Sequence, residues 1–136
     1  MVLSLTIVTF SLPQDLEKNL NDIVKCMGFL NRSEAIRHAL RLLASELMVL
    51  ESLKGKVLAI IAVVYRRDSQ KTKVHRIQHE HGDIINAYFH AHIDNKKCLE
   101  IMVVHGDAER LRGLVNGLRG SRGLEQMKVA VLNRVE

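Results

Sequence analysis

The sequence predicts an α+β protein with two domains, the first ordered β-α-α and the second β-α-β-β-α-β. Three patterns predict this fold class. Apolar residues alternate with polar ones near the N-terminus, two amphipathic helical stretches follow, and buried strand-like runs then alternate with helical segments. The break at Lys54-Gly55-Lys56 separates the two patterns. We therefore expect domains over residues 1–52 and 53–136.

The first predicted element is a strand over residues 5–12 with one apolar face. Apolar and largely polar positions alternate there with the period of two that a strand requires: Val8, Phe10 and Leu12 against Ile7, Thr9 and Ser11. An isolated strand cannot satisfy its own ladder of backbone groups. This domain should therefore need a second copy of the chain, whose strand would pair with it.

Two helices are predicted after this strand. The first lies between Pro13 and Gly28, where apolar residues recur at helical spacing and glycine supplies a stop signal. The second runs from about residue 32 to about 52, with Asn31 as its N-cap and Glu34 three residues later. Their apolar stripes offer little volume for a core, which again indicates a domain that needs a partner.

The second predicted domain follows the order of a ferredoxin-like fold. Its buried strands should pair around a tight turn at residues 94–97. The expected elements are a strand at Val57–Tyr65, a helix ending near Gly82, a strand at Ile84–Ile93, a strand at Cys98–His105, a helix capped by Asp107 and running to about Leu118, and a strand at Met127–Leu132.

Composition narrows the class of partner and the location. The formal net charge of +5 favours a polyanionic partner. Aromatic residues make up 4% of the chain and Trp is absent, which disfavours a module that stacks single-stranded bases. Cys26 and Cys98 lie in unlike contexts, so we expect no disulfide. Neither a signal peptide nor an apolar run of ~20 residues is evident, so we expect a cytoplasmic protein with no membrane association.

The residues that carry chemistry lie around the turn of the second domain. His90 and His92 are two apart on a predicted strand, so their side chains should point to the same face. The turn should bring Cys98 across from them on the neighbouring strand. Two imidazoles and a thiolate suit Zn, Cu, Fe or Ni. Glu100 shares the face of Cys98 and could hold a ligand imidazole by its second nitrogen.

A fourth ligand cannot be chosen from spacing alone. His79 and His81 both lie near the end of the helix that precedes the histidine strand. Either could reach the site, from the same subunit or from another one.

These segments together resemble a known family. The strand at Ile7–Leu12 and the segment Gly28–Arg37, which contains Asn-Arg-Ser-Glu, look like a ribbon-helix-helix DNA-binding domain. The segments Gln78–His81, Phe89–Ile93 and Cys98–Ile101 resemble the metal-binding half of the nickel-responsive repressors of the NikR family. The likeness spans nearly the whole chain in a consistent order.

The resemblance implies how the metal is bound and how the protein assembles. It implies a homotetramer, a dimer of dimers, in which ribbon-helix-helix domains flank a core of ACT-like domains. It implies square-planar Ni(II) held by His90, His92 and Cys98 of one subunit and by His79 of its neighbour. It also implies a transcriptional repressor of nickel-uptake genes rather than an enzyme.

The resemblance also suggests how double-stranded operator DNA would be bound. Paired strands would enter the major groove and present Ile7, Thr9 and Ser11 to the bases. Asn31, Arg32 and Ser33 at the start of the second helix would contact phosphate. Ile7 stands where the family commonly has Arg, so guanine recognition by that side chain is lost. His38 stands where the family commonly has Asp, which argues against an auxiliary cation site near Glu34.

Three other functions compete with this one. A ribbon-helix-helix regulator could use its ACT-like half to sense an organic ligand or another metal, and regulation would then survive Cys98→Ala. A metalloenzyme is disfavoured because no obvious general acid or base accompanies the cluster. An antitoxin would fit the first half of the chain and leave the histidine segment unexplained.

Overall fold

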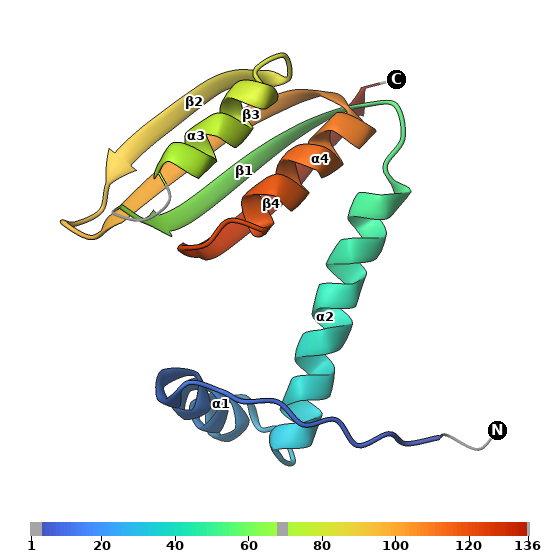
Figure 1. Cartoon of the computed structure of the whole chain (residues 1–136). Coiled ribbons are helices and arrows are strands. Elements are labelled where there is room, and N and C mark those ends of the chain that lie inside the picture. Colours follow the sequence, from blue (N-terminus) through green and yellow to red (C-terminus); the bar gives the residue numbers. More distant parts are fainter. Residues whose placement is uncertain (1–3, 68–70, 136) are drawn as a thin grey trace. The chain divides into compact units, whose positions relative to one another are not determined.

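The computed structural model describes residues 4–67 and 71–135, which form two compact units (Figure 1). The N-terminal unit ends at Met48 and the C-terminal unit begins at Val49. Within each unit the residues contact one another closely.

The N-terminal unit is made of helices. Helix α1 spans Gln14–Met27 and ends at Gly28, whose φ of 72° lies in the left-handed region that favours glycine. Helix α2 spans Arg32–Ser52, so its last turn belongs to the C-terminal unit. Asn31 Oδ1 accepts a hydrogen bond of 2.9 Å from the backbone N–H of Glu34, which confirms the predicted N-cap.

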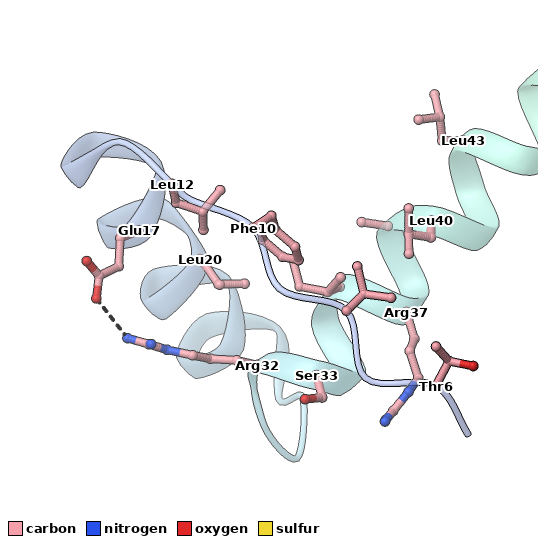
Figure 2. A pocket seen from close by; sticks show the side chains of 13 residues that line it. Thr6, Phe10, Leu12, Glu17, Leu20, Arg32, Ser33, Arg37, Leu40 and Leu43 are labelled. Carbon is pink, nitrogen blue, oxygen red and sulfur yellow. Dashed lines mark hydrogen bonds and ion pairs between the residues drawn. The ribbon is translucent and has the colours of Figure 1, made fainter. Parts of the chain in front are cut away.

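The predicted strand over residues 5–12 is not formed in this single chain, where residues 4–13 have no regular secondary structure. The physical reason is that a strand needs a partner for its backbone groups. The predicted alternation is nevertheless present. Thr6, Val8, Phe10 and Leu12 line a groove of about 890 Å³ against α1 and α2, several of them visible in Figure 2, whereas Ile7 is 93% exposed.

The C-terminal unit is an antiparallel sheet with two helices. Its strands are ordered β2-β3-β1-β4, and its elements follow one another as β-α-β-β-α-β, which confirms the predicted order. The elements are β1 (Lys56–Arg66), α3 (Lys71–Glu80), β2 (Ile85–His92), β3 (Lys97–Asp107), α4 (Ala108–Arg119) and β4 (Leu124–Val135).

Both helices of this unit cover the same face of the sheet, and the core lies between them and the strands (Figure 1). On β1 every second side chain from Val57 to Tyr65 is buried, because alternate strand positions face the helices. Helix α4 contributes Leu111, Leu114 and Leu118 to the same core. Asp107 occupies the predicted N-cap position of α4, but its side chain makes no capping hydrogen bond.

No helix among the described residues is long and apolar enough to cross a membrane.

Candidate metal centre

A tight turn sets the alignment of the two strands that carry the predicted ligands. Asp94 Oδ1 accepts hydrogen bonds from the backbone N–H groups of Lys96 (2.7 Å) and Lys97 (2.8 Å). These bonds, together with the positive charges of both lysines, hold the pKa of Asp94 below its usual range. Strands β2 and β3 then pair so that His92 lies opposite Cys98 and His90 lies opposite Glu100.

Three side chains meet beside this turn. Ring nitrogens of His90 and His92 and the Sγ of Cys98 all lie within 4.8 Å of one another. Cys98 Sγ is 3.5 Å from His92 Nδ1, and the two imidazole rings meet edge to face with centroids 5.0 Å apart. Cys98 is buried, His90 is half-buried and His92 is exposed. The site is therefore closed to solvent at Cys98 and open to solvent at His92.

The buried Glu100 carboxylate holds one of these imidazoles. Its Oε1 lies 2.8 Å from His90 Nδ1, which leaves Nε2 as the nitrogen available to a metal ion. A contact of this kind, from Glu100 to one of the ligand imidazoles, is what its position on the face of Cys98 suggests. With Nδ1–H donating to the carboxylate, the ring orientation and tautomer are both fixed.

Glu100 has three further partners that the sequence alone does not reveal. One is His75 on α3, whose Nε2 lies 3.7 Å from Glu100 Oε1. The Tyr65 hydroxyl donates to Glu100 Oε1 at 2.8 Å, and Gln78 Nε2 donates to Glu100 Oε2. Burial, and then the hydrogen bond to Glu100, raise the pKa of Tyr65 far above its usual value, so it stays a donor. In the structure Tyr65, on β1, pairs in register with Cys98, and the sequence alone carries no signal of this pairing.

The two candidates for the fourth ligand lie apart from this cluster. His79 is exposed on α3 and lines a small cavity of about 310 Å³ with Gln78 and Tyr88, outside the group of three ligand atoms. His81 follows the helix and turns inward, with Nδ1 at 2.8 Å from the carbonyl oxygen of Ile77. The role of His79 as the fourth ligand stays a prediction.

The residues predicted to contact DNA lie on the N-terminal unit, and all of them are exposed: Ile7, Thr9, Ser11, Asn31, Arg32 and Ser33. The side chain of Arg32 donates to Asn21 Oδ1 at 2.9 Å and to Glu17 Oε1 at 3.2 Å, the latter contact drawn in Figure 2, and Asn31 Oδ1 caps α2 as described above. Their contacts with DNA remain predictions.

The match to a family model decides which proteins this chain belongs with. Residues 58–132 match the model described as the NikR C-terminal nickel-binding domain, and this is more than half of the chain. The chain is a member of the NikR family.

Curated relatives extend this likeness over nearly the whole chain. A protein of Methanocaldococcus jannaschii is 36% identical over 127 residues, covering 92% of this chain and 90% of its own length. One from Methanococcus vannielii is 33% identical over the same shares, and one from Methanothermobacter thermautotrophicus is 31% identical over 90% of this chain and 89% of its own. All three are provisionally named nickel-responsive regulators.

A solved structure supports the fold of part of the chain. An uncharacterized protein from Thermotoga maritima superimposes with a TM-score of 0.54 at 17% identity, covering 58% of this chain and all of its own. At this identity the likeness concerns the fold alone.

Nickel, as Ni(II), is the metal of this NikR domain, and the donor atoms present suit it. Two imidazoles and one thiolate form a set that first-row transition metals of this kind prefer over hard oxygen ligands. One imidazole is already oriented by a carboxylate, as in metal sites generally. The residues at this position therefore fit the metal that the family binds.

Proposed function

We propose that this protein is a nickel-responsive, DNA-binding transcriptional regulator, and that its nickel-loaded form represses nickel-uptake genes. The observation that carries the proposal is the cluster of His90, His92 and Cys98, with ligand atoms within 4.8 Å of one another inside the nickel-binding domain of the family.

Within this proposal each side chain of the metal centre has a distinct task. His90, His92 and Cys98 hold Ni(II) from one subunit, and His79 of a second copy completes the set. Glu100 keeps His90 in one tautomer, while Tyr65 and Gln78 keep Glu100 in place. Bound Ni(II) supplies a cross-link between subunits. Such a cross-link favours one arrangement of the assembly over others, which is what a sensor requires.

The N-terminal unit supports dimer formation through its strand segment. Leu40 and Leu43 line its apolar groove and are 60% and 58% exposed, respectively, and Phe10 on the segment is 58% exposed. We propose that the same segment of a second copy pairs with residues 5–12 and covers this groove. The pairing would supply the ladder of hydrogen bonds that the single chain lacks.

The paired segments would form the part that contacts DNA. Ile7, Thr9 and Ser11 point away from the groove lining, so in a two-stranded ribbon they would face outward together. A ribbon of this width fits the major groove. The N-terminus of α2, at Asn31, Arg32 and Ser33, would contact phosphate, although Arg32 would have to exchange Glu17 for it.

A second apolar surface supports assembly from dimer to tetramer. The sheet face opposite α3 and α4 carries partly exposed apolar side chains, with Phe89, 59% exposed, paired in register with Ile101. An open apolar sheet face of this kind is typical of a surface that another subunit covers. We propose that it joins two dimers in a homotetramer.

The proposal is tested by selecting DNA with the full-length protein. A pool of randomised duplexes is enriched with and without Ni(II), and the affinity of a selected duplex is then measured under both conditions. We expect enrichment of paired half-sites only with nickel, and affinity at least about fivefold weaker without it. Equal affinity with and without Ni(II) would contradict the sensor function.

Two pairs of variants separate the metal centre from general effects. Cys98→Ala should abolish the nickel dependence, whereas Cys26→Ala, at an exposed cysteine on α1, should keep it. His79→Ala should act like Cys98→Ala, and His81→Ala should act like the unmodified protein. Regulation that survives Cys98→Ala would favour an organic effector instead. Repression itself is tested with a nickel-uptake promoter fused to a reporter, whose output should fall with nickel only when the protein is present.

A further inference from the structure

The last turn of helix α2 has no basic side chain of its own to offset the partial negative charge of its carbonyl groups. The last carbonyl groups of a helix lack partners within the helix and carry partial negative charge, so basic side chains usually lie in the last turn. Two of these carbonyl groups have local donors, because the Leu53 N–H donates to Leu50 O at 3.4 Å and the Ser52 hydroxyl donates to Val49 O at 2.9 Å. Neither donor carries positive charge.

Arg112, on helix α4, supplies positive charge to this turn although it lies about 60 residues further along the chain. Its Nη1 donates to the carbonyl oxygens of Leu50 at 3.2 Å and of Leu53 at 2.9 Å. The side chains of Leu50 and Leu53 are both buried in the core of the C-terminal unit. Nearby, the backbone N–H of Ala108, the first residue of α4, donates to Gly55 O at 2.8 Å. Hydrogen bonds therefore hold residues 50–55 against the first turns of α4.

Helix α4 is in turn packed closely against α3, which carries His79. Two glycines allow this approach: a Cβ on Gly117 would lie 3.2 Å from Ile77 Cγ2, and a Cβ on Gly113 would lie 3.3 Å from His81 Nε2. Gln78, also on α3, donates to Glu100, which holds His90. A continuous series of packed and hydrogen-bonded groups thus runs from the metal centre to Arg112, all within the C-terminal unit.

We infer that Arg112 is a positioning residue that ties the last turn of α2 to the metal-binding domain, so that nickel loading changes the order of that turn. Helix α2 begins at Arg32, among the residues proposed to contact phosphate, and ends where Arg112 caps it. The inference rests on the proposed function. A guanidinium suits this task because it is always charged and holds its N–H donors in a fixed plane, here with Nη1 shared between two carbonyl oxygens. A lysine ammonium supplies the charge without that fixed geometry.

Hydrogen exchange of the full-length protein tests the inference without DNA. In the unmodified protein, Ni(II) should slow exchange of the backbone amides of residues 50–54 by about fivefold or more, which is the size of a typical coupling. Arg112→Ala should remove this slowing and Arg112→Lys should restore part of it. Arg119→Gln, an exposed arginine on the last turn of the same helix, serves as the matched control and should behave like the unmodified protein.

Nickel affinity shows whether Arg112 acts on coupling or on folding. We expect Arg112→Ala to bind Ni(II) within about twofold of the unmodified protein while the nickel-dependent gain in affinity for the selected duplex falls by about fivefold or more. Full nickel-dependent slowing at residues 50–54 in Arg112→Ala, or loss of its nickel affinity, would overturn the inference. If the unmodified protein binds DNA equally with and without nickel, the proposed function fails, whereas the exchange experiment still tests Arg112.

Discussion

The two units of this chain place their apolar side chains in opposite ways. The C-terminal unit buries a continuous core between its sheet and two helices, including Ile61, Leu111 and Leu114. In the N-terminal unit, Ala35 is the one buried residue among those that the structure describes, and large apolar side chains such as Ile7 and Leu40 remain exposed. The contrast supports the proposal that the first unit folds against a second copy, whereas the second unit has a core of its own.

The largest expected effect concerns this dependence on a partner. Leu40→Asp places a charge in the groove that a second copy would cover, and burying an unpaired charge is strongly unfavourable. We expect loss of association through the N-terminal unit and a drop in its helical content, measured by analytical ultracentrifugation and circular dichroism. Lys18→Asp, on the exposed surface of α1, is the charge control and should leave both measurements unchanged. Association that persists in Leu40→Asp would show that this groove is not the interface.

A core substitution tests whether the C-terminal unit is stabilised by its own buried core. Leu114→Ala removes a fully buried side chain of α4, and such a deletion costs about 2–5 kcal/mol through lost burial and a residual cavity. Denaturant unfolding of the C-terminal unit should show this loss in the free energy of unfolding, without a change in the N-terminal signal. A loss below about 1 kcal/mol would mean that the core relaxes around the cavity or is less tightly packed than described.

The carboxylate of the metal centre offers a smaller and more specific effect. Glu100→Gln keeps the shape of the side chain but weakens its hold on His90, and changes to such partners of metal ligands lower metal affinity by about 10- to 100-fold. Competition with a calibrated chelator measures the nickel affinity. Glu109→Gln, at an exposed position in the first turn of α4, is the control and should keep the original affinity. An unchanged affinity in Glu100→Gln would remove Glu100 from the metal centre.

The smallest expected effect is a pH-dependent one at the surface. Arg110 donates to both carboxylate oxygens of Asp83 and holds the pKa of that carboxyl below its usual range. A lowered folded-state pKa contributes stability above the usual Asp range, and this is lost as pH falls through the lowered pKa. Asp83→Asn should therefore be slightly less stable than the unmodified protein at neutral pH, with the difference vanishing in acid. Because the pair is exposed, the effect should also shrink in high salt. A difference that grows toward acid pH would have the wrong sign.

Much of the C-terminal unit could be predicted from the sequence because its patterns are local. Alternating burial on β1, the turn around Asp94 and the spacing of His90, His92 and Cys98 depend on strand periodicity and turn chemistry. The same periodicity puts Glu100 on the face of Cys98, whereas His90 as its partner is seen in the structure. What periodicity cannot show is which distant side chain meets a given group, so the bonds from Tyr65 and Gln78 to Glu100 and from Arg112 to Leu53 came only from the structure.

The N-terminal unit shows the complementary limit. The alternation over residues 5–12 predicts one apolar side, and that side lines the groove in the structure. The strand itself was not formed, because backbone pairing depends on a second chain and not on the pattern alone. His79 also stays a prediction, because spacing leaves it open beside His81 and only the resemblance assigns it to the metal of a neighbouring subunit.

Absorption spectroscopy of the nickel-loaded, full-length protein tests the metal centre most directly. If Cys98 and the two histidines bind Ni(II), titration should produce a thiolate-to-nickel charge-transfer band that saturates at one ion per chain. The band should be absent in Cys98→Ala and retained in Cys26→Ala. A band that survives Cys98→Ala, or saturating nickel binding with no thiolate band, would place the metal elsewhere and contradict the site described here.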